Sequence, residues 1–473
     1  MRNKKLLIYF LLLFIAGCAT VNKTNYDYWK NLPILEEFKK DQRILILAPH
    51  PDDESIACAG VIQKALSVGA QVKIVYLTNG DHNELSFIVY EKRLTMRQGE
   101  FVHMGKVRQK EAIKAMKFLG LSEDNLVFLG YPDFGTFNIF CNHWQTKKPF
   151  RDRLTRISNV PYKDSPSYGA SYSGENILKD LTHQILSYQP DIIFVSHPAD
   201  VNVDHKSLYL FLQIVLSDLT AQIPTPKVYP YLVHTVGWPK PRHYHPELEI
   251  YPPDKFIGSS INWQRLNLSM AELDKKYKSI LLYKSQTQVS AFYLLAFARR
   301  NELFGDYPVL DLAPKPLTND APITYLGISK MFKDTQEWTE TQDEPDVAQD
   351  NELVSYAQED DYFIVRLDLP KQLGWRFGVM LYIFGYNSNI PFAQMPKIRI
   401  ITSGRAIKVL SGKETVVNSG VLLDLNKDYL ILKVPFKLLN DPDYLLTSLK
   451  MRRGNLTIDA VGYRKIRINP DVD

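Results

Sequence analysis

The chain has 473 residues and a formal net charge of +5, and its Lys and Arg residues are dispersed along the sequence. A length beyond roughly 250–300 residues exceeds what one hydrophobic core usually supports, so we expect two or more domains. The dispersed charge offers no basic patch for nucleic acid, and the three cysteines form no disulfide framework.

The first residues are typical of an exported, lipid-modified protein. Basic residues precede the apolar run Leu6–Ile15, and small residues stand directly before Cys18. The run is shorter than the about 20 residues of a membrane-spanning helix. We therefore expect a lipoprotein signal peptide at 1–17, lipid attachment at Cys18 and an anchor linker at 18–40; an ordinary signal peptide or a short anchor helix is the alternative. Since Ala19 is not an aspartate, the resemblance to Gram-negative lipoproteins favours the outer membrane of a bacterial cell envelope.

The next segment is an apolar run that ends in metal-binding and acid–base side chains. Ile44–Ala48 is short and aliphatic, which is typical of a strand buried on both faces of a parallel sheet. The polar residues after it are His50, Asp52, Asp53 and Glu54. Ligands of open α/β sheets bind beyond the carboxyl ends of such strands. A helix is predicted at 55–68, with Gly69 just after its end.

The spacing of these side chains separates their expected roles. His50 and Asp53 are three residues apart, so a turn or the start of a helix puts both on one side, where they can share a cation. Asp52 then points elsewhere, as a general base beside a metal-bound water would. A zinc site of this kind needs a further ligand from a distant segment. The alternative is a strand-to-helix turn whose acids only cap the helix.

Strand and helix signals then alternate along the chain. Further strands are predicted at 71–78, 126–129 and 191–196, and helices at 107–119 and 175–188. Each strand ends in polar residues. The alternation predicts an α/β domain with a Rossmann-like, mostly parallel sheet flanked by helices and a site along one edge. The aperiodic segment 134–172 is predicted to be a lid or a substrate wall.

Two motifs together resemble those of the LmbE/PIG-L-like deacetylases, zinc enzymes that remove N-acetyl groups from glucosamine-type sugars. Residues 48–54, A-P-H-P-D-D-E, are similar to the family's A-H-P-D-D-E signature. A downstream family pattern, H-P-x-D-x-H-x-D-H, is matched at His197, Asp200, Asp204 and His205. The resemblance implies zinc held by His50, Asp53 and His205. It also implies Asp52 as the general base, and Asp204 as a carboxylate that supports a ligand or balances the charge of the site.

Weaker matches extend this resemblance over roughly residues 41–305. They imply that Arg108 and Asp133 lie near the substrate, and His197 is expected to contact it too. For Arg108 the alternative is a solvated face of an amphipathic helix. Ser285, two residues after Tyr283, resembles a late family motif that could equally serve packing.

The chain departs from the family pattern at Asn202, where a histidine that stabilises the oxyanion or protonates the amine is usual. Asparagine offers an N–H donor but cannot titrate. We therefore expect Asn202 to keep the oxyanion role and the acid role to pass to Asp52. The alternative is that Asn202 only shapes the loop before the metal ligand.

The last third of the chain changes in pattern. An acidic stretch at 331–350 is expected to be a solvated linker between a deacetylase-like domain at 41–330 and a separately folding β sandwich at 351–473. Strands are predicted at 362–367, 379–384, 397–402, 406–410, 430–435 and 456–461. The sandwich loosely resembles DOMON or carbohydrate-binding domains, so glycan binding and a spacer role both remain open.

These observations predict a lipid-anchored, zinc-dependent hydrolase. Its expected substrate is an N-acetylated amino sugar or glycan of the N-acetylglucosamine type, or a related small amide, and its expected membrane contact is through Cys18. One rival is a zinc hydrolase of another amide or ester, and the other is a non-catalytic, lipid-anchored glycan-binding protein.

Overall fold

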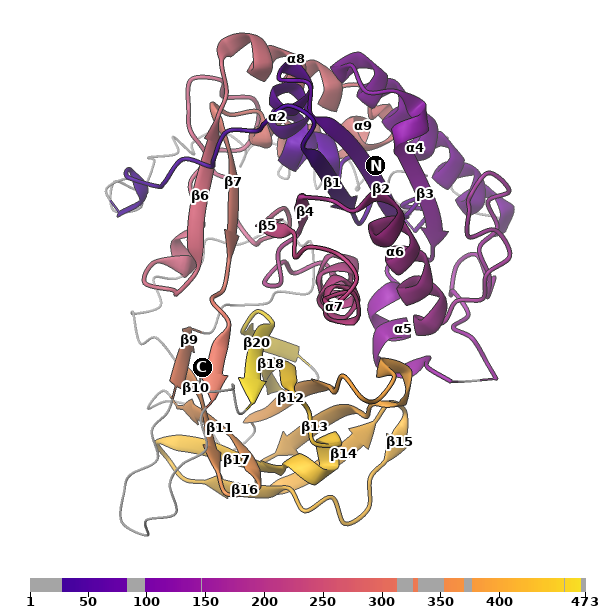
Figure 1. Ribbon diagram of the computed structural model, residues 1–473. Helices are drawn as coiled ribbons and strands as arrows, with labels where there is room; N and C mark the ends of the chain where they lie inside the picture. Colours follow the sequence, from indigo (N-terminus) through magenta and orange to yellow (C-terminus); the bar gives the residue numbers. More distant parts are fainter. Residues whose placement is uncertain are drawn as a thin grey trace, which may run out of the picture.

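A computed structural model describes residues 28–82, 98–145, 147–312, 326–330, 353–369, 377–454 and 456–468. The predicted signal peptide, Cys18 and the acidic linker lie outside these residues. Within the described part of the chain, no helix combines the length and the apolar character needed to cross a membrane. Figure 1 shows an α/β unit stacked on a β-rich unit.

The α/β unit is built on a parallel sheet of five strands in the order β3-β2-β1-β4-β5. The strands are β1 (Arg43–Ala48), β2 (Gln71–Thr78), β3 (Leu126–Tyr131), β4 (Ile192–Ser196) and β5 (Lys227–Tyr231). Ile44 and Ile46 of the central strand pack on one face of the sheet, and Leu45 and Leu47 on the other. A strand covered on both faces needs an unbroken aliphatic run, which is the pattern that predicted it.

Helices cover both faces of this sheet, which confirms the predicted Rossmann-like arrangement. The helices are α2 (Asp53–Ser67), α4 (Gln98–Leu119), α5 (Thr136–Asn142), α6 (Gly174–Tyr188), α7 (Val203–Asp218), α8 (Met270–Ile280) and α9 (Lys284–Leu294). Apolar residues of α2, α4, α8 and α9 share a core with one face, and those of α5, α6 and α7 share a core with the other. An antiparallel pair, β6 (Asn262–Asn267) and β7 (Asn301–Asp306), lies beside β5 and α2.

The segment expected to be a lid or substrate wall is largely packed into the domain. It contains α5, and its Val160, Tyr162 and Tyr172 are buried in the same core as α6 and α7. The Tyr162 hydroxyl donates to Asp81 at 2.6 Å. The segment is therefore a wall of the α/β unit along most of its length.

The β-rich unit consists of two mainly antiparallel sheets. One has the order β16-β17-β11-β10-β9, and the other β15-β14-β13-β12-β18-β20-β8, with β19 beside β18. In the first sheet the strands are β9 (Leu326–Lys330), β10 (Leu353–Glu359), β11 (Tyr362–Asp368), β16 (Leu422–Leu425) and β17 (Tyr429–Pro435). In the second they are β8 (Leu310–Leu312), β12 (Phe377–Tyr386), β13 (Lys397–Ser403), β14 (Ala406–Ser411), β15 (Glu414–Thr415), β18 (Tyr444–Arg453), β19 (Leu456–Ala460) and β20 (Arg464–Ile468). Residues of both sheets form one core, and the predicted β-rich C-terminal region is confirmed.

The boundary between the two units differs from the predicted one. Strands β8 and β9 precede residue 331 but pair with β20 and β10 of the C-terminal sheets. The crossing therefore occurs soon after β7, before the acidic stretch.

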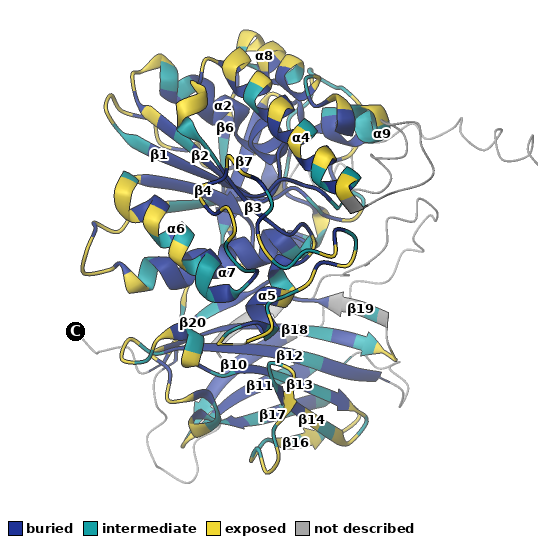
Figure 2. Cartoon of the chain, turned by 90° about the vertical axis from the view of Figure 1, so that its right-hand side faces the viewer, coloured by how far each residue is buried: buried dark blue, intermediate teal, exposed yellow. Residues whose placement is uncertain are grey.

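The two units also share a core, so the expectation of few contacts between them is wrong, whereas their separate folding stays a prediction. On β12, Leu381 and Ile383 point into the sandwich, whereas Tyr382 and Phe384 join the core of α5 and α7. The ring of Phe140 on α5 lies 5.0 Å from that of Phe384. Figure 2 shows buried residues on α5, β12 and β18 where the units meet.

Candidate metal centre

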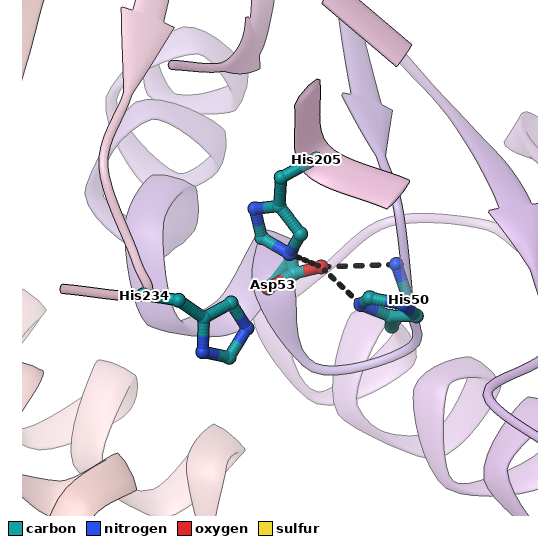
Figure 3. A group of neighbouring side chains, drawn as sticks. All are labelled: His50, Asp53, His205 and His234. Carbon is teal, nitrogen blue, oxygen red and sulfur yellow. Dashed lines mark hydrogen bonds and ion pairs between the residues drawn. The ribbon is translucent and has the colours of Figure 1, made fainter. Parts of the chain in front are cut away.

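The predicted ligands His50, Asp53 and His205 lie together at the carboxyl edge of the parallel sheet. His50 follows β1, Asp53 opens α2, and His205 stands in the first turn of α7. The Asp53 Oδ2 atom lies 3.3 Å from His50 Nδ1 and 3.2 Å from His205 Nε2. Figure 3 shows both rings turned toward this oxygen. The structure thus brings residues from two distant motifs into one cluster.

Local backbone chemistry fixes the first motif. Pro49 and Pro51 restrict the backbone on either side of His50, whose N–H donates to Asp53 Oδ2 at 2.9 Å. Asp52 adopts φ = 133°, in the region that favours glycine. Strained backbone conformations of this kind cluster at functional sites.

A carboxylate stands behind each of the two imidazoles. The Asp200 Oδ2 atom lies 3.1 Å from His205 Nδ1. The His50 Nε2 atom lies 3.0 Å from Asp133 Oδ1 and 3.2 Å from Asp204 Oδ2. Such partners orient metal-ligating imidazoles and raise their basicity. The far nitrogen of each ring therefore lies against a carboxylate, and the near nitrogen faces Asp53.

Asp204 is held by the turn after β3, next to His50. Its carboxylate accepts the N–H of Phe134 at 2.6 Å, the N–H of Thr136 at 3.1 Å and the Thr136 hydroxyl. The side chain has no exposed surface. This position fits the predicted carboxylate that supports a ligand and balances charge.

Asp133 also contacts His50. Its second oxygen accepts the His82 N–H at 3.1 Å. Burial raises its pKa, but His50, Arg108 and His82 together lower that pKa below its usual value, so the carboxylate stays charged. Its first oxygen lies beside His50, and no contact with substrate is described, so that contact stays a prediction.

The electrostatics of the cluster favour protons on its imidazoles when no metal is bound. Burial lowers the pKa of His205, but Asp200 and Asp53 together raise this pKa by more, so that its net value is about 9. Burial raises the pKa of Asp53, but His205 and His50 hold it well below its usual range. Metal ligands must be deprotonated, so a cation would displace these protons.

Asp52 has the surroundings expected of a proton acceptor. Its carboxylate lies 3.3 Å from Arg108 Nη2, and its N–H donates to Glu54 at 3.1 Å. Burial raises the pKa of Asp52 and Arg108 lowers it, with a net value of about 7. A general base works best when its pKa is near the working pH.

Arg108 links the first two loops of the sheet edge. It donates to Pro51 O at 2.9 Å and to Gly80 O at 3.0 Å, and its side chain is 5% exposed. The alternative of a solvated helix face is therefore wrong. A Cβ on Gly80, which has φ = 65°, would lie 2.0 Å from the guanidinium, so this close approach requires glycine.

The late motif at Tyr283 and Ser285 contacts the helices α2 and α4. The Tyr283 hydroxyl donates to Glu54, and the Ser285 hydroxyl donates to Glu111 at 2.6 Å. Burial raises the pKa of Glu54 to about 8. These contacts favour the alternative in which Ser285 serves packing.

Two of the predicted site residues have structural contacts. The fully buried His197 ring stacks on Trp263 at 5.3 Å, and its Nδ1 accepts the Ala199 N–H at 3.0 Å. The prediction that His197 contacts substrate is therefore wrong, because packing encloses the ring. The Asn202 side-chain oxygen accepts the Asp204 N–H at 2.8 Å and caps α7, as expected if Asn202 shapes this loop. The oxyanion role of its amide stays a prediction.

His234 is a fourth residue of the cluster that the sequence did not predict as a ligand. It lies three residues after β5, and one of its donor atoms is within 4.8 Å of those of His50, Asp53 and His205. Burial lowers the pKa of His234 to about 4, so the ring is neutral at pH 7. The sequence gives no motif spacing for His234. The strand before it, β5, also contains an interior proline, so it was not predicted.

The donor set fits a zinc ion. Zinc binds nitrogen at about 2.0–2.1 Å, which places the ligand atoms of a tetrahedral site roughly 3.4 Å apart. The distances of 3.2 Å and 3.3 Å around Asp53 Oδ2 match that separation. Two imidazoles and a carboxylate are also a ligand set that catalytic zinc uses.

Residues 45–215 match the family model PIG-L, described as GlcNAc-PI de-N-acetylase. The matched residues include both metal motifs. No match was found among curated proteins.

Several solved structures resemble part of the chain. A conserved protein from Thermus thermophilus is 21% identical with a TM-score of 0.32, covering 54% of this chain and 84% of that chain. The N,N'-diacetylchitobiose deacetylase from Pyrococcus horikoshii is 18% identical with a TM-score of 0.32, covering 56% and 78%. The 4-carboxy-2-hydroxymuconate hydratase GalB from Pseudomonas putida is 16% identical with a TM-score of 0.33, covering 59% and 100%. At these identities and TM-scores, the likenesses say nothing about activity.

Proposed function

We propose that the protein is a zinc-dependent deacetylase that hydrolyses the N-acetyl group of an N-acetylglucosamine-type sugar. The observation that carries this proposal is the cluster of His50, Asp53 and His205 beside Asp52 at the carboxyl edge of the sheet. The family match over residues 45–215 supports an acetylated amino sugar as the substrate class.

The chain supplies both the ligands and the proton acceptor for hydrolysis of an amide. When bound by His50, Asp53 and His205, zinc would lower the pKa of a water and polarise the amide carbonyl. Asp52 then accepts the proton of the attacking water on its carboxylate and returns it to the leaving amine. Asp52 precedes the ligand Asp53 in the chain and interacts electrostatically with all three ligands, which supports this role.

Arg108 and Glu54 position Asp52. Arg108 Nη2 holds the carboxylate from one side, and Glu54 accepts the Asp52 N–H. Glu54 has no exposed surface and is also bound by Tyr283, which makes Asp52 the better placed base.

The experiment is a metal and substrate test of purified protein with His205→Ala as the matched control. We expect about one zinc per chain and release of acetate from N-acetylated amino sugars, with both lost in the variant. The same panel includes peptides and simple esters. Faster hydrolysis of either class, or a protein that takes up no zinc, would overturn the proposal.

We further propose that the chain is anchored by lipid at Cys18 in the outer membrane. The apolar run and the small residues before Cys18 support this location. Radiolabelled fatty acid should enter the wild-type protein and not Cys18→Ser, which should also leave the membrane fraction. Equal labelling of the two proteins would exclude Cys18 as the attachment site.

A further inference from the structure

A third imidazole faces the proposed zinc site. One donor atom of His234 lies within 4.8 Å of those of His50, Asp53 and His205. Its ring meets that of His205 edge-on, with centroids 4.7 Å apart. Figure 3 shows one ring nitrogen of His234 turned toward Asp53 and His50.

Hydrogen bonds around His234 fix both its backbone and its tautomer. Its N–H donates to Asp200 Oδ2 at 2.8 Å, the carboxylate that also backs His205. The Tyr293 hydroxyl donates its only hydrogen to Val233 O at 2.7 Å. The same hydroxyl lies 3.4 Å from His234 Nδ1, so toward this nitrogen it acts as an acceptor. When the ring donates from Nδ1 to this hydroxyl, its Nε2 presents a lone pair to the cluster.

This arrangement repeats that of the other two imidazoles. In each, one nitrogen contacts an acceptor of the protein and the other faces the cluster. A lone pair directed at a cation is a ligand, whereas an N–H would be a donor to substrate. We propose that His234 is a fourth protein ligand of the metal ion. The inference rests on the proposed function, because it needs a divalent ion in the cluster.

The four ligands differ in how strongly they are supported. His205 and His50 are backed by carboxylates, whereas His234 is backed by the neutral phenol of Tyr293. Carboxylate partners raise the basicity of an imidazole ligand, so His234 binds the ion least strongly. Because four protein ligands can fill a tetrahedral zinc site, His234 would be the ligand that gives way to water.

The test measures the coordination of Co²⁺ and the affinity for Zn²⁺ rather than turnover. In wild type, visible Co²⁺ absorption and X-ray absorption should indicate three imidazole ligands, and in His234→Gln two. Zinc affinity, measured by chelator competition, should fall by about 10-fold to 100-fold in His234→Gln. Removing a residue that only hydrogen-bonds a metal ligand already costs this much, so removing a ligand should cost at least as much. His245→Gln is the control, because that half-buried histidine pairs with Glu247.

A second pair of variants gives a positive signal. In His234→Cys the thiolate should add a sulfur-to-cobalt charge-transfer band, which His234→Ser should lack. Wild type is the blank, since its Cys58 and Cys141 are buried.

The outcomes separate the two proposals. A wild-type protein that binds no divalent ion would overturn both. Stoichiometric binding, with unchanged cobalt spectra and zinc affinity in His234→Gln and no new band in His234→Cys, would overturn only the fourth ligand.

Discussion

At the residue scale, the cluster is defined by how each ring is held as much as by which residues are present. His50 and His205 each lie between Asp53 and a second carboxylate. These carboxylates make the near nitrogens better ligands, and in the metal-free protein they also favour protonation. Proton and metal therefore compete for the same atoms.

This competition predicts a pH dependence. The pKa of His205 is raised to about 9 in the metal-free protein, so zinc must displace its proton at pH 7. We expect zinc affinity to rise with pH up to about 9, by about tenfold per unit for each proton displaced. The raised pKa stabilises the metal-free fold fully below the unfolded value of about 6.5, and this contribution is lost as pH rises through 9. Chelator-buffered titrations and melting curves from pH 6 to 9 measure both effects; a zinc affinity independent of pH would contradict the assignment.

Asp52 has a prediction of its own. Asp52→Asn keeps the shape of the side chain and its place beside Arg108, but an amide cannot accept the proton. We expect unchanged zinc content and a loss in kcat of about 100-fold to 10,000-fold. The measurement is steady-state deacetylation at fixed zinc. Near wild-type turnover would assign the base to another carboxylate, with Asp204 and Glu54 to be tested next.

Asn202 separates a capping role from an oxyanion role. Asn202→Ser keeps an N-cap oxygen for Asp204 N–H but removes the amide donor, whereas Asn202→Ala removes both. If Asn202 only caps α7, the serine variant should retain the wild-type Tm and turnover within about tenfold, and the alanine variant should lose about 0.5–2 kcal/mol of stability. A loss of about 100-fold or more in the serine variant, with unchanged Tm, would instead establish the oxyanion role.

The sequence predicted some site residues better than others for a physical reason. His50 and Asp53 are local in sequence, so their spacing alone put them on one side of a turn. His205 required a family resemblance, since its approach to Asp53 depends on the order of β1 and β4 in the sheet. His234 depends on β5, and Lys227–Tyr231 gives no clear strand signal because it contains Pro230, which only an edge strand tolerates.

At the element scale, buried polar contacts fix α2, the helix that carries Asp53. Glu302 on β7 accepts the N–H groups of Gly60 and Val61 on α2 and the ammonium of Lys276 on α8. A Cβ on Gly60 would lie 2.2 Å from Leu268, so glycine permits this close packing. The hydrophobic pattern predicted α2 but not these contacts, because no local period marks a buried ion pair.

This ion pair gives a prediction for stability. The side chains of Glu302 and Lys276 are each 1% exposed. Glu302→Gln leaves a buried ammonium without its charge partner, which costs about 3–5 kcal/mol. Denaturant unfolding measures the loss, and adding Lys276→Met should recover part of it. The exposed pair of Lys278 and Asp274 is the control, where Asp274→Asn should cost at most about 0.5 kcal/mol. Equal effects at both pairs would contradict the role of the buried pair.

At the scale of the whole molecule, the β-rich unit supports the second metal motif. The Tyr463 N–H donates to Pro198 O at 3.2 Å, and a Cβ on Gly462 would lie 2.7 Å from that of Ala199. Side chains of β12 point alternately into the sandwich and into the α/β unit, which explains why the sequence did not predict the shared core. A strand buried on both faces has the same apolar run whether its second face meets its own sandwich or another domain, so the run predicts burial but not the partner.

The shared core predicts the outcome of a truncation. Removing residues 351–473 would uncover the apolar faces of α5 and α7, including Phe140 and Phe211, whose rings lie 4.9 Å apart beside Phe384. We expect the truncated protein to aggregate and to lose zinc, because an exposed apolar patch of this kind favours association and His205 lies on α7. Phe384→Ala in the full chain tests the same interface without truncation and should cost about 3–5 kcal/mol. Size-exclusion chromatography and zinc analysis measure the first effect, and denaturant unfolding measures the second. A monomeric truncated protein with a full complement of zinc would show that the α/β unit folds without the sandwich.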